Sequence, residues 1–536
     1  MKSVMINKFQ DVPDIDVPRS KFDRSCGYKT TLNSGYLYPV FYDEVLPGDT
    51  KRLNTTFFGR LATPLTPFMD NIFLDYHLWF VPRRLIWNNW QKFMGEQVNK
   101  DDSIDFILPE CKAPKGGFPR YGLADYFGVP PAVEGISMDA GYLRSYNIVW
   151  NEWYRSEQLQ DSVEVPLDDG PDDYSKYNLL KRGKHFDYFT SCLPSPQKGP
   201  GVELPLGTTA PVVGNGLALG LTNGTNNYGM TFYNSNQLGV LDAFQGVYGS
   251  KVGSSASGSQ PGSGNHAIGL TKDGSKSGLV VDLSNATATT INTLRQAIAK
   301  QQFLERDARY GTRYIELIYS HFGVHSPDAR LQRPEYLGGG TTRLNINQIA
   351  QTSETTETSP QGNLTAYGTL ASTGNGFTRS FTEHGIIIGL VSIRADLNYQ
   401  QGIDRTFSRK SRYDFYWPSF AHLGEQAVLN KEIYAQGTEA DEDVFGYNER
   451  YAEYRYKPSL ITGKFRSSDP QTLDSWHLAQ NFVNLPTLSS QFIEENPPIK
   501  RVIAVQDEPE FLLDCYHDFE DIREIPVYGV PGLMRL

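Results

Sequence analysis

The sequence predicts an all-β protein, and three observations support this prediction. Aromatic residues make up 12% of the 536 residues, with 31 Tyr and 29 Phe, and strands favour these side chains. The 49 Gly and 32 Pro indicate many turns between short elements. Several segments also show the alternating or continuous apolar patterns of strands.

The first elements follow from these patterns in chain order. Residues 1–27 are interrupted by prolines and mixed in charge, which predicts an extended N-terminal arm. Residues 28–45 are rich in β-branched and aromatic residues, which predicts a strand or a pair of strands. From Ile72 to Phe80 the even positions are apolar, while Asp75 and His77 lie on the other side. This alternation predicts a half-buried strand that ends at Pro82, because proline cannot donate to a ladder.

Helical spacing begins directly after this strand. Ile86, Trp90 and Phe93 recur at three and four residues, which predicts a short helix that ends at Gly95. A tryptophan-bearing helix of this kind needs a large apolar surface, which can belong to its own chain or to a neighbouring subunit, and the sequence leaves both possibilities open. The region 99–198 is interrupted by Gly and Pro, which indicates long connections.

Three further segments complete the expected organisation. An apolar stripe from Leu294 to Ile315 predicts the longest helix. The run GIIIGLVSIRAD from Gly385 predicts a core strand that is buried on both faces. Between Leu204 and Thr271 the only charged side chains are Asp242 and Lys251. We interpret residues 205–280 as a surface insertion with short strands and a mobile tip near 253–264, with a flexible linker as the alternative.

Charge and cysteine content restrict the function. A formal net charge of -11 excludes a protein that is basic over its whole surface, although one face can still be basic. The four cysteines have no paired spacing, which favours reduced thiols in a cytoplasm. Neither a signal peptide nor a membrane span is recognisable, so we expect a soluble protein without membrane insertion.

Motifs for catalysis and cofactor binding are not found. His321 and His325 have the spacing of metal ligands, but without an HExxH pattern a structural role is favoured. The sequence contains no phosphate-binding loop, nucleophile elbow or dinucleotide-binding glycine motif. We therefore predict no catalytic residues, no metal and no cofactor. Paired carboxylates for glycoside hydrolysis stay a weak alternative, since their separation is invisible in a sequence.

The segment GIDRTFSRKSRYDFYWPSF combines cations with aromatic residues. Such mixtures suit single-stranded DNA, because cations neutralise phosphates and rings stack on unpaired bases. The alternative is that the arginines pair with carboxylates across a subunit interface and that the aromatic side chains are core. The predicted DNA-facing residues are Arg405, Arg409, Lys410, Arg412, Tyr413 and Trp417.

Five long motifs resemble the major capsid protein of small single-stranded DNA phages, the microviruses, in their gokushovirus branch. They are PRSKFDRSCGYKTTLNSGYLYPVFYDEVLPGDT, LATPLTPFMDN, LIWNNWQKFMGEQ, HSPDARLQRPEYLGG and the ending VYGVPGLMRL. Because these motifs reach from one end of the chain to the other, the resemblance is essentially full length. Differences are concentrated in the Gly/Asn/Ser-rich insertion.

The resemblance implies an eight-stranded antiparallel jelly roll of the viral capsid type with long inter-strand insertions and a few helices. It implies a single capsid domain over residues 28–536, self-assembly into a T=1 icosahedral shell around a circular single-stranded DNA genome, and assembly in the bacterial host cytoplasm. Expected partners are further copies of the chain, a small basic DNA-binding virion protein, a scaffolding protein and a host cell-surface receptor.

Host attachment is expected from the insertion at residues 205–280, which the resemblance implies is a protrusion. The candidate attachment residues are its aromatic side chains Tyr228, Phe232, Tyr233, Phe244 and Tyr248. The alternative function is that of a β-rich cell-surface recognition or carbohydrate-binding protein, which the missing secretion signal disfavours.

Overall fold

The computed structural model describes residues 18–99, 101–202, 291–310, 314–324, 332–356 and 360–528, with five short strands between residues 212 and 281. The chain divides into two compact units. The first contains residues Met1–Lys198 and Leu304–Leu536, and the second contains Gly199–Phe303. Each unit is described by itself.

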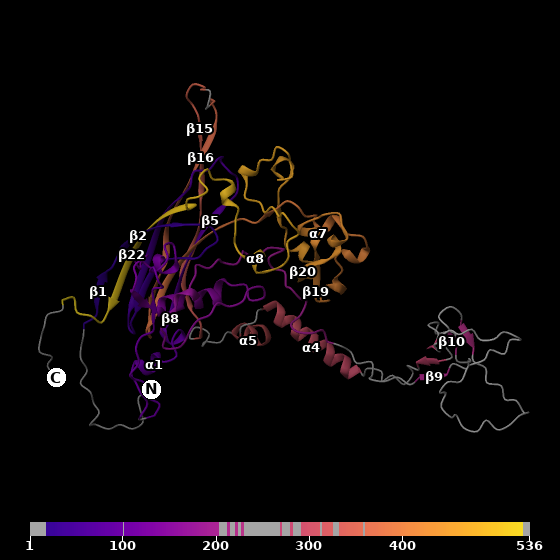
Figure 1. Ribbon diagram of the computed structural model, residues 1–536, viewed down its shortest axis with the longest axis horizontal. Coiled ribbons are helices and arrows are strands. Elements are labelled where there is room, and N and C mark those ends of the chain that lie inside the picture. The colour runs from indigo at the N-terminus through magenta and orange to yellow at the C-terminus, as the bar shows by residue number, and fades with distance from the viewer. Residues whose placement is uncertain are drawn as a thin grey trace, which may run out of the picture. The chain divides into compact units, whose positions relative to one another are not determined.

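Two antiparallel sheets form the body of the first unit (Figure 1). In the six-stranded sheet the order is β1-β22-β4-β16-β15, and β2 also pairs with β22. In the four-stranded sheet the order is β14-β5-β17-β3. The strands of the first sheet are β1 (Ser20–Asp23), β2 (Cys26–Leu32), β4 (Thr50–Leu61), β15 (Asn345–Ala350), β16 (Leu364–Ser380) and β22 (Phe511–Arg523). Those of the second are β3 (Tyr38–Val45), β5 (Ile72–Pro82), β14 (Glu335–Arg343) and β17 (Gly385–Ala395).

The main core lies between the two sheets. Phe57 of β4 and Tyr76 of β5 meet edge to face with ring centroids 4.8 Å apart, and Phe41 of β3 meets Phe519 of β22 at 5.3 Å. Both sheets contribute alternate apolar residues to this core, as a β-sandwich requires. The predicted strand or strand pair in residues 28–45 is therefore two strands, of which β2 belongs to one sheet and β3 to the other.

The opposite face of the four-stranded sheet is also covered. Trp79 and Val81 of β5 and Ile388 of β17 belong to a second core with the connection that follows β5. The predicted double burial of the Gly385 strand is confirmed, because nearly every residue of β17 is buried. The predicted strand over Ile72–Phe80 is confirmed as β5, with its even positions buried. Its predicted half-burial is wrong, because Asp75 and Trp79 on the other face are buried as well.

The connection between residues 83 and 198 is more structured than the sequence indicated. It contains helices α1 (Trp90–Phe93), α2 (Leu123–Tyr126) and α3 (Ala140–Val149) and the small sheet β7 (Ser137–Asp139), β6 (Glu110–Lys112) and β8 (Asp172–Asp173). Arg144 of α3 is fully buried and donates from Nε to Asp172 at 2.8 Å. This ion pair joins α3 to β8 within the connection.

The predicted tryptophan helix is shorter than its apolar spacing suggested. Residues Arg83–Leu85 form a 3₁₀ turn, and only α1 is α-helical. The amide of Gly95 donates to Lys92 O at 2.9 Å with a φ of +100°, so the predicted glycine stop is confirmed. Trp87 and Trp90 are both buried against the chain itself, which favours packing on its own sandwich.

The predicted long helix is two helices, α4 (Ile291–Tyr310) and α5 (Tyr314–Phe322). α4 ends directly before Gly311, and glycine is unfavourable in a helix interior. Within the second unit the described strands are β9 (Val212–Gly214), β10 (Gly220–Thr222), β11 (Asn227–Gly229), β12 (Gly269–Leu270) and β13 (Leu279–Val281). Short strands therefore occur in the 205–280 insertion. The 253–264 tip lies outside the described residues.

A third core supports the segment after β17. It joins Tyr188 and Phe189 to Val428, Ile433 and Phe445. The elements around it are β18 (Asn398–Tyr399), β19 (Glu425–Leu429), α7 (Asn430–Ile433), β20 (Val444–Glu449), β21 (Ser459–Leu460) and α8 (Ser490–Ile493). Figure 1 shows α7, β19 and β20 beside the sandwich. We call residues 397–510 the β17–β22 insertion.

Candidate nucleic-acid interface

The basic and aromatic residues predicted to face DNA lie on the surface of the β17–β22 insertion. The segment contains three short 3₁₀ turns, at Arg405–Phe407, Arg412–Asp414 and Pro418–Phe420, and the remaining predicted residues lie between them. The second turn is fixed by a capping box, in which Ser411 Oγ accepts from the amide of Tyr413 at 3.2 Å and Asp414 accepts from the amide of Ser411 at 2.7 Å. This turn presents Arg412 and Tyr413 to the outside.

Arg405 is directed into its own chain. It donates to Glu432 Oε1 at 2.9 Å and to Ala427 O at 2.8 Å. Glu432 also accepts from the Tyr188 hydroxyl at 2.7 Å, and its carboxylate is almost fully buried. Burial raises the pKa of Glu432, while the charge of Arg405 opposes that rise. Arg405 therefore compensates a buried carboxylate and has little capacity left for a phosphate.

Arg409 is also largely buried, but its contact with a carboxylate is an ion pair without a hydrogen bond. Its guanidinium lies 3.6 Å from Glu453 Oε1 and over the rings of Phe415 and Tyr454, at 4.9 and 4.8 Å from their centroids. Only 11% of its side chain is exposed. Arg409 thus organises the aromatic surface from beneath.

Lys410 and Arg412 are exposed. Lys410 has one partner, Glu442, at 3.4 Å, and 78% of its side chain is open to solvent. Arg412 stacks on Tyr413 at 4.8 Å, and in the described part of the chain no carboxylate lies within ion-pair distance of it. These two cations are available to an anionic ligand.

The aromatic side chains of the segment are half to largely exposed. Trp417 donates its indole N–H to Arg412 O at 2.8 Å, which fixes one ring beside the exposed arginine. The exposed members are Phe407, Tyr413, Phe415, Tyr416 and Trp417. The alternative that these rings are core is therefore wrong for the single chain, and Arg405 and Arg409 pair with carboxylates of the same chain.

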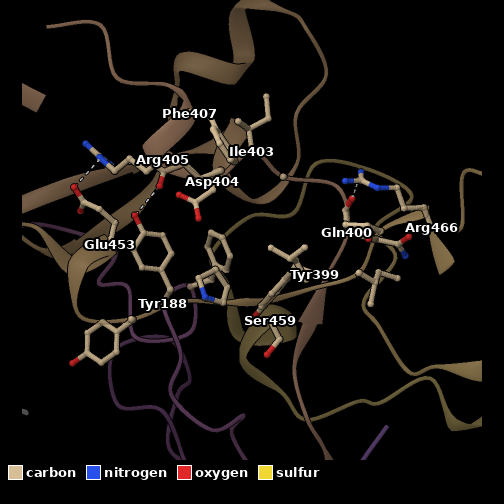
Figure 2. A pocket seen from close by; sticks show the side chains of 18 residues that line it. Tyr188, Tyr399, Gln400, Ile403, Asp404, Arg405, Phe407, Glu453, Ser459 and Arg466 are labelled. Atoms are coloured by element: carbon tan, nitrogen blue, oxygen red, sulfur yellow. Dashed lines mark hydrogen bonds and ion pairs between the residues drawn. The ribbon is translucent and has the colours of Figure 1, made fainter. Parts of the chain in front are cut away.

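A pocket of about 370 Å³ opens beside this surface (Figure 2). Figure 2 shows Phe407 and Ile403 at one side and Gln400 with Arg466 at the other. Its polar side chains are engaged with the protein: Tyr399 donates to Asp187 at 2.6 Å, and Gln400 donates to Ser467 Oγ at 2.9 Å. The pocket therefore offers mainly apolar and aromatic surface.

Sequence reasoning missed the residues that decide which cations are free. Glu432, Glu453 and Tyr188 come from distant parts of the chain, and no spacing in the sequence connects them to Arg405. The only available signal was the excess of carboxylates over cations in the whole chain, which makes internal pairing of arginines common.

The candidate attachment residues are located only in part. Tyr228 lies on β11, whereas Phe232, Tyr233, Phe244 and Tyr248 lie outside the described residues. Of the two histidines with ligand spacing, His321 Nε2 lies 2.6 Å from Asp307 Oδ1, and His325 is outside the described residues. Among the residues that are described, no group of His, Cys, Asp and Glu side chains is arranged to hold a metal ion.

Two further observations concern the cysteines and the helices. All four cysteines are free thiols, and burial raises the pKa of Cys111 to about 12. Across the described ranges, no helix combines the length and the apolar character needed to cross a membrane.

Comparison with known proteins extends over nearly the whole chain. The family described as "Capsid protein (F protein)" matches residues 10–533. Capsid protein VP1 of Bdellovibrio phage phiMH2K is 46% identical over 98% of this chain and 97% of that protein. Capsid protein VP1 of Chlamydia phage 1 is 43% identical over 100% of this chain and 99% of that protein. Capsid protein VP1 of Spiroplasma virus 4 is 36% identical over 97% of this chain and 96% of that protein.

These matches favour a capsid protein over the cell-surface recognition and glycosidase alternatives. The matching proteins are structural components of virions, so the chain is a structural protein and not an enzyme. A capsid protein associates with copies of itself to form a shell and is part of the virion. The full-length match confirms the resemblance drawn from the five motifs, and the chain belongs to the capsid protein family of the microviruses, in its gokushovirus branch.

Proposed function

We propose that this chain forms a T=1 icosahedral shell that encloses a circular single-stranded DNA genome, and that its two sheets are an eight-stranded jelly roll. The order β2-β22-β4-β16 in one sheet and β3-β17-β5-β14 in the other supports the jelly roll. Consecutive members of this set lie in different sheets, except β5 and β14, which are antiparallel neighbours joined by a long connection, as in two interlocked Greek keys. β1 and β15 extend the first sheet.

The DNA-facing surface is the exposed part of the β17–β22 insertion. The observation that carries this proposal is the position of Lys410 and Arg412 among exposed rings, while Arg405 and Arg409 are held by carboxylates. Phosphates would contact the two free cations, and unpaired bases would stack on the Tyr413 and Trp417 rings at roughly 1–3 kcal/mol each.

The experiment is the double variant Lys410→Gln with Arg412→Gln. Particles should assemble, but they should contain or retain less DNA than the parent particles. The difference should be largest at low salt, because a surface with fewer phosphate contacts releases fewer counterions and its DNA binding depends less on salt. DNA content is measured as the ratio of absorbance at nucleic-acid and protein wavelengths in particles purified at a series of salt concentrations.

The matched control is Lys29→Gln with Arg52→Gln. These two cations are also exposed and face carboxylates, at 2.8 Å from Asp514 and 3.6 Å from Glu520, but they lie on the six-stranded sheet. Equal DNA loss in both double variants would show that the loss follows from the lower positive charge and not from this surface. Normal DNA content of the first variant at every salt concentration would remove this surface from the genome contact.

The remaining parts of the proposal rest on the resemblance to the microvirus capsid proteins. Residues 205–280 would form an outer protrusion that contacts the host receptor, with Tyr228, Phe232, Tyr233, Phe244 and Tyr248 as contact candidates. Residues 1–27 would act as an arm, a small basic protein would share the genome contact, and a scaffolding protein would guide assembly in the bacterial cytoplasm. Deletion of residues 253–264 should leave particles that assemble but adsorb poorly, and normal adsorption would exclude the tip from attachment.

A further inference from the structure

The β15–β16 hairpin continues beyond the paired part of the six-stranded sheet (Figure 1). β16 pairs with β4 from Thr369 to Ser380, whereas its first part, from Leu364 to Thr369, pairs with β15. The hairpin extends further through the bond from the Gln351 amide to Asn363 O at 2.9 Å. At its outer end, the described chain therefore forms a ribbon of two strands.

Only one face of this ribbon is covered, and only towards its base, where Ala366 and Gly368 are buried and Ile346 packs against the main core. Ala366 is 3% exposed, but Ile349, Leu364 and Tyr367 are 47%, 39% and 40% exposed. A two-stranded ribbon without a packed face is marginally stable in water. A third strand or a covering surface would stabilise it.

The outer edge of β15 is open. Among the described residues, β15 pairs with β16 alone. Because the Gln351 amide faces β16, alternation places the amides of Asn345, Asn347 and Ile349 towards β16 as well. The amides of Ile346, Gln348 and Ala350 consequently face the open edge.

The composition of β15 distinguishes it from the other edge strands of the two sandwich sheets. Natural edges are usually protected from pairing by charges or proline. β1 and β2 carry Lys21, Asp23 and Lys29, β14 carries Glu335 and Arg343, and β3 carries Pro39, Asp43 and Glu44. The sequence of β15, NINQIA, contains neither a charge nor a proline. This edge lacks the usual protection.

We propose that β15 pairs antiparallel with β15 of a second copy of this chain, so that the two six-stranded sheets join across a two-fold axis. An antiparallel pair of identical strands is self-complementary, which is the property of a two-fold interface. Two uncharged edges meet without like-charge repulsion. A second copy is the occupant because this chain belongs to a family that assembles with itself. The inference does not depend on the proposed DNA contact.

The first test measures hydrogen exchange in unassembled chains and in particles. The amides of Ile346, Gln348 and Ala350 should exchange at least tenfold more slowly in particles, because they become donors to the second copy. The amides of Ser353 and Glu354, at the tip, serve as the internal control and should change little. Equal exchange of the three edge amides in both states would overturn the proposal.

The second test uses proline at an edge position. Gln348→Pro removes a donor that is free in the single chain, so the unassembled chain should keep its unfolding temperature while particle yield falls at least tenfold. Gln348→Ala is the matched control and should assemble normally. Normal assembly of Gln348→Pro would overturn the proposal, and if this variant fails to fold, the exchange experiment decides.

A third test identifies the occupant. Cysteine is placed singly at each position from Asn345 to Ala350 in a Cys26→Ser background, which removes the exposed native thiol. Self-pairing predicts disulfide-linked dimers at one or two neighbouring positions close to the two-fold axis, after mild oxidation of particles. Pairing with a different segment of a neighbour predicts dimers at none of these positions and would overturn the self-pairing.

Discussion

Two lysines show how differently the sandwich and the β17–β22 insertion use the same side chain. Lys51 of β4 is fully buried, with Nζ 2.6 Å from Asp43, 2.9 Å from Asp521 and 3.4 Å from Asp49. Lys410 is 78% exposed, and its partner Glu442, at 3.4 Å, is exposed as well. The first holds strands of both sheets together, and the second leaves its charge free for a ligand. The position of nearby carboxylates, not the residue type, separates the two roles.

The same division occurs within the predicted DNA-binding segment. Arg405 and Arg409 are held by Glu432 and Glu453, whereas Lys410 and Arg412 face solvent. These four cations look like one basic patch in the sequence, but the structure divides them into two layers. Arg405 and Arg409 form a structural layer beneath the surface, and Lys410 and Arg412 form a candidate binding layer above it. Four substitutions test this difference between buried, partnered side chains and exposed ones.

The largest effect is expected for Lys51→Met. The change leaves Asp43, Asp49 and Asp521 buried with fewer compensating charges, although Arg24 and Arg523 remain nearby. Removing one partner from a buried ion-pair network should cost about 3–5 kcal/mol of unfolding free energy. Urea unfolding of the unassembled chain, followed by tryptophan fluorescence, measures this loss, and a change below about 1 kcal/mol would contradict the assigned role.

The next effect concerns His517 of β22, which is 1% exposed and lies 3.0 Å from both Thr55 Oγ1 and Val40 O. Burial lowers the pKa of His517 to about 4, against about 6.5 in an unfolded chain. The unfolded state therefore binds more protons between these values, so stability is complete above pH 6.5 and falls as pH drops towards 4. This group contributes up to about 3 kcal/mol to that fall.

The test for His517 is the pH dependence of unfolding. His517→Gln keeps a donor and an acceptor but cannot titrate, so the unfolding free energy should fall less steeply between pH 6.5 and pH 4 than in the parent chain. His422→Gln, which changes an exposed histidine of the β17–β22 insertion, is the control. An unchanged slope in His517→Gln would contradict the buried neutral state.

A smaller effect is expected for Arg405→Gln. This change leaves the Glu432 carboxylate buried with a weaker donor, which should cost about 2–3 kcal/mol. Because Glu432 is held in the third core, the β17–β22 insertion should become more sensitive to limited proteolysis while the sandwich stays protected. If Arg405→Gln keeps its full unfolding free energy but its particles lose DNA, the structural role assigned to Arg405 is wrong and Arg405 contacts the DNA instead.

The smallest effect on stability is expected for Lys410→Gln. An exposed ion pair contributes little, so the unfolding free energy should change by less than about 0.5 kcal/mol. Arg405→Gln and Lys410→Gln thus form a matched pair from one segment, in which the first should lose stability and the second should lose DNA retention. Equal loss of stability in both would remove the distinction between the two layers.

Four features could be predicted from the sequence alone: the strand-rich class, the proline that ends β5, the glycine stop at Gly95 and the double burial of β17. These features depend on local properties of the residues. Aromatic and β-branched side chains favour strands, proline has no N–H to donate to a sheet, and a strand buried on both faces appears in the sequence as one continuous apolar run. The long motifs also determined the family, because they are specific over the whole chain.

The tertiary structure decided what local patterns leave open. Asp75 and His77 suggested a solvent-facing side of β5, but the connection after β5 covers that side and Arg182 pairs with Asp75 at 2.6 Å. Burial raises the pKa of Asp75, yet hydrogen bonding from His185 and the charge of Arg182 outweigh it and hold that pKa well below its usual range. Polar residues can be buried wherever partners arrive from distant segments. For the same reason, only the fold separated the bound arginines, Arg405 and Arg409, from the free cations beside them.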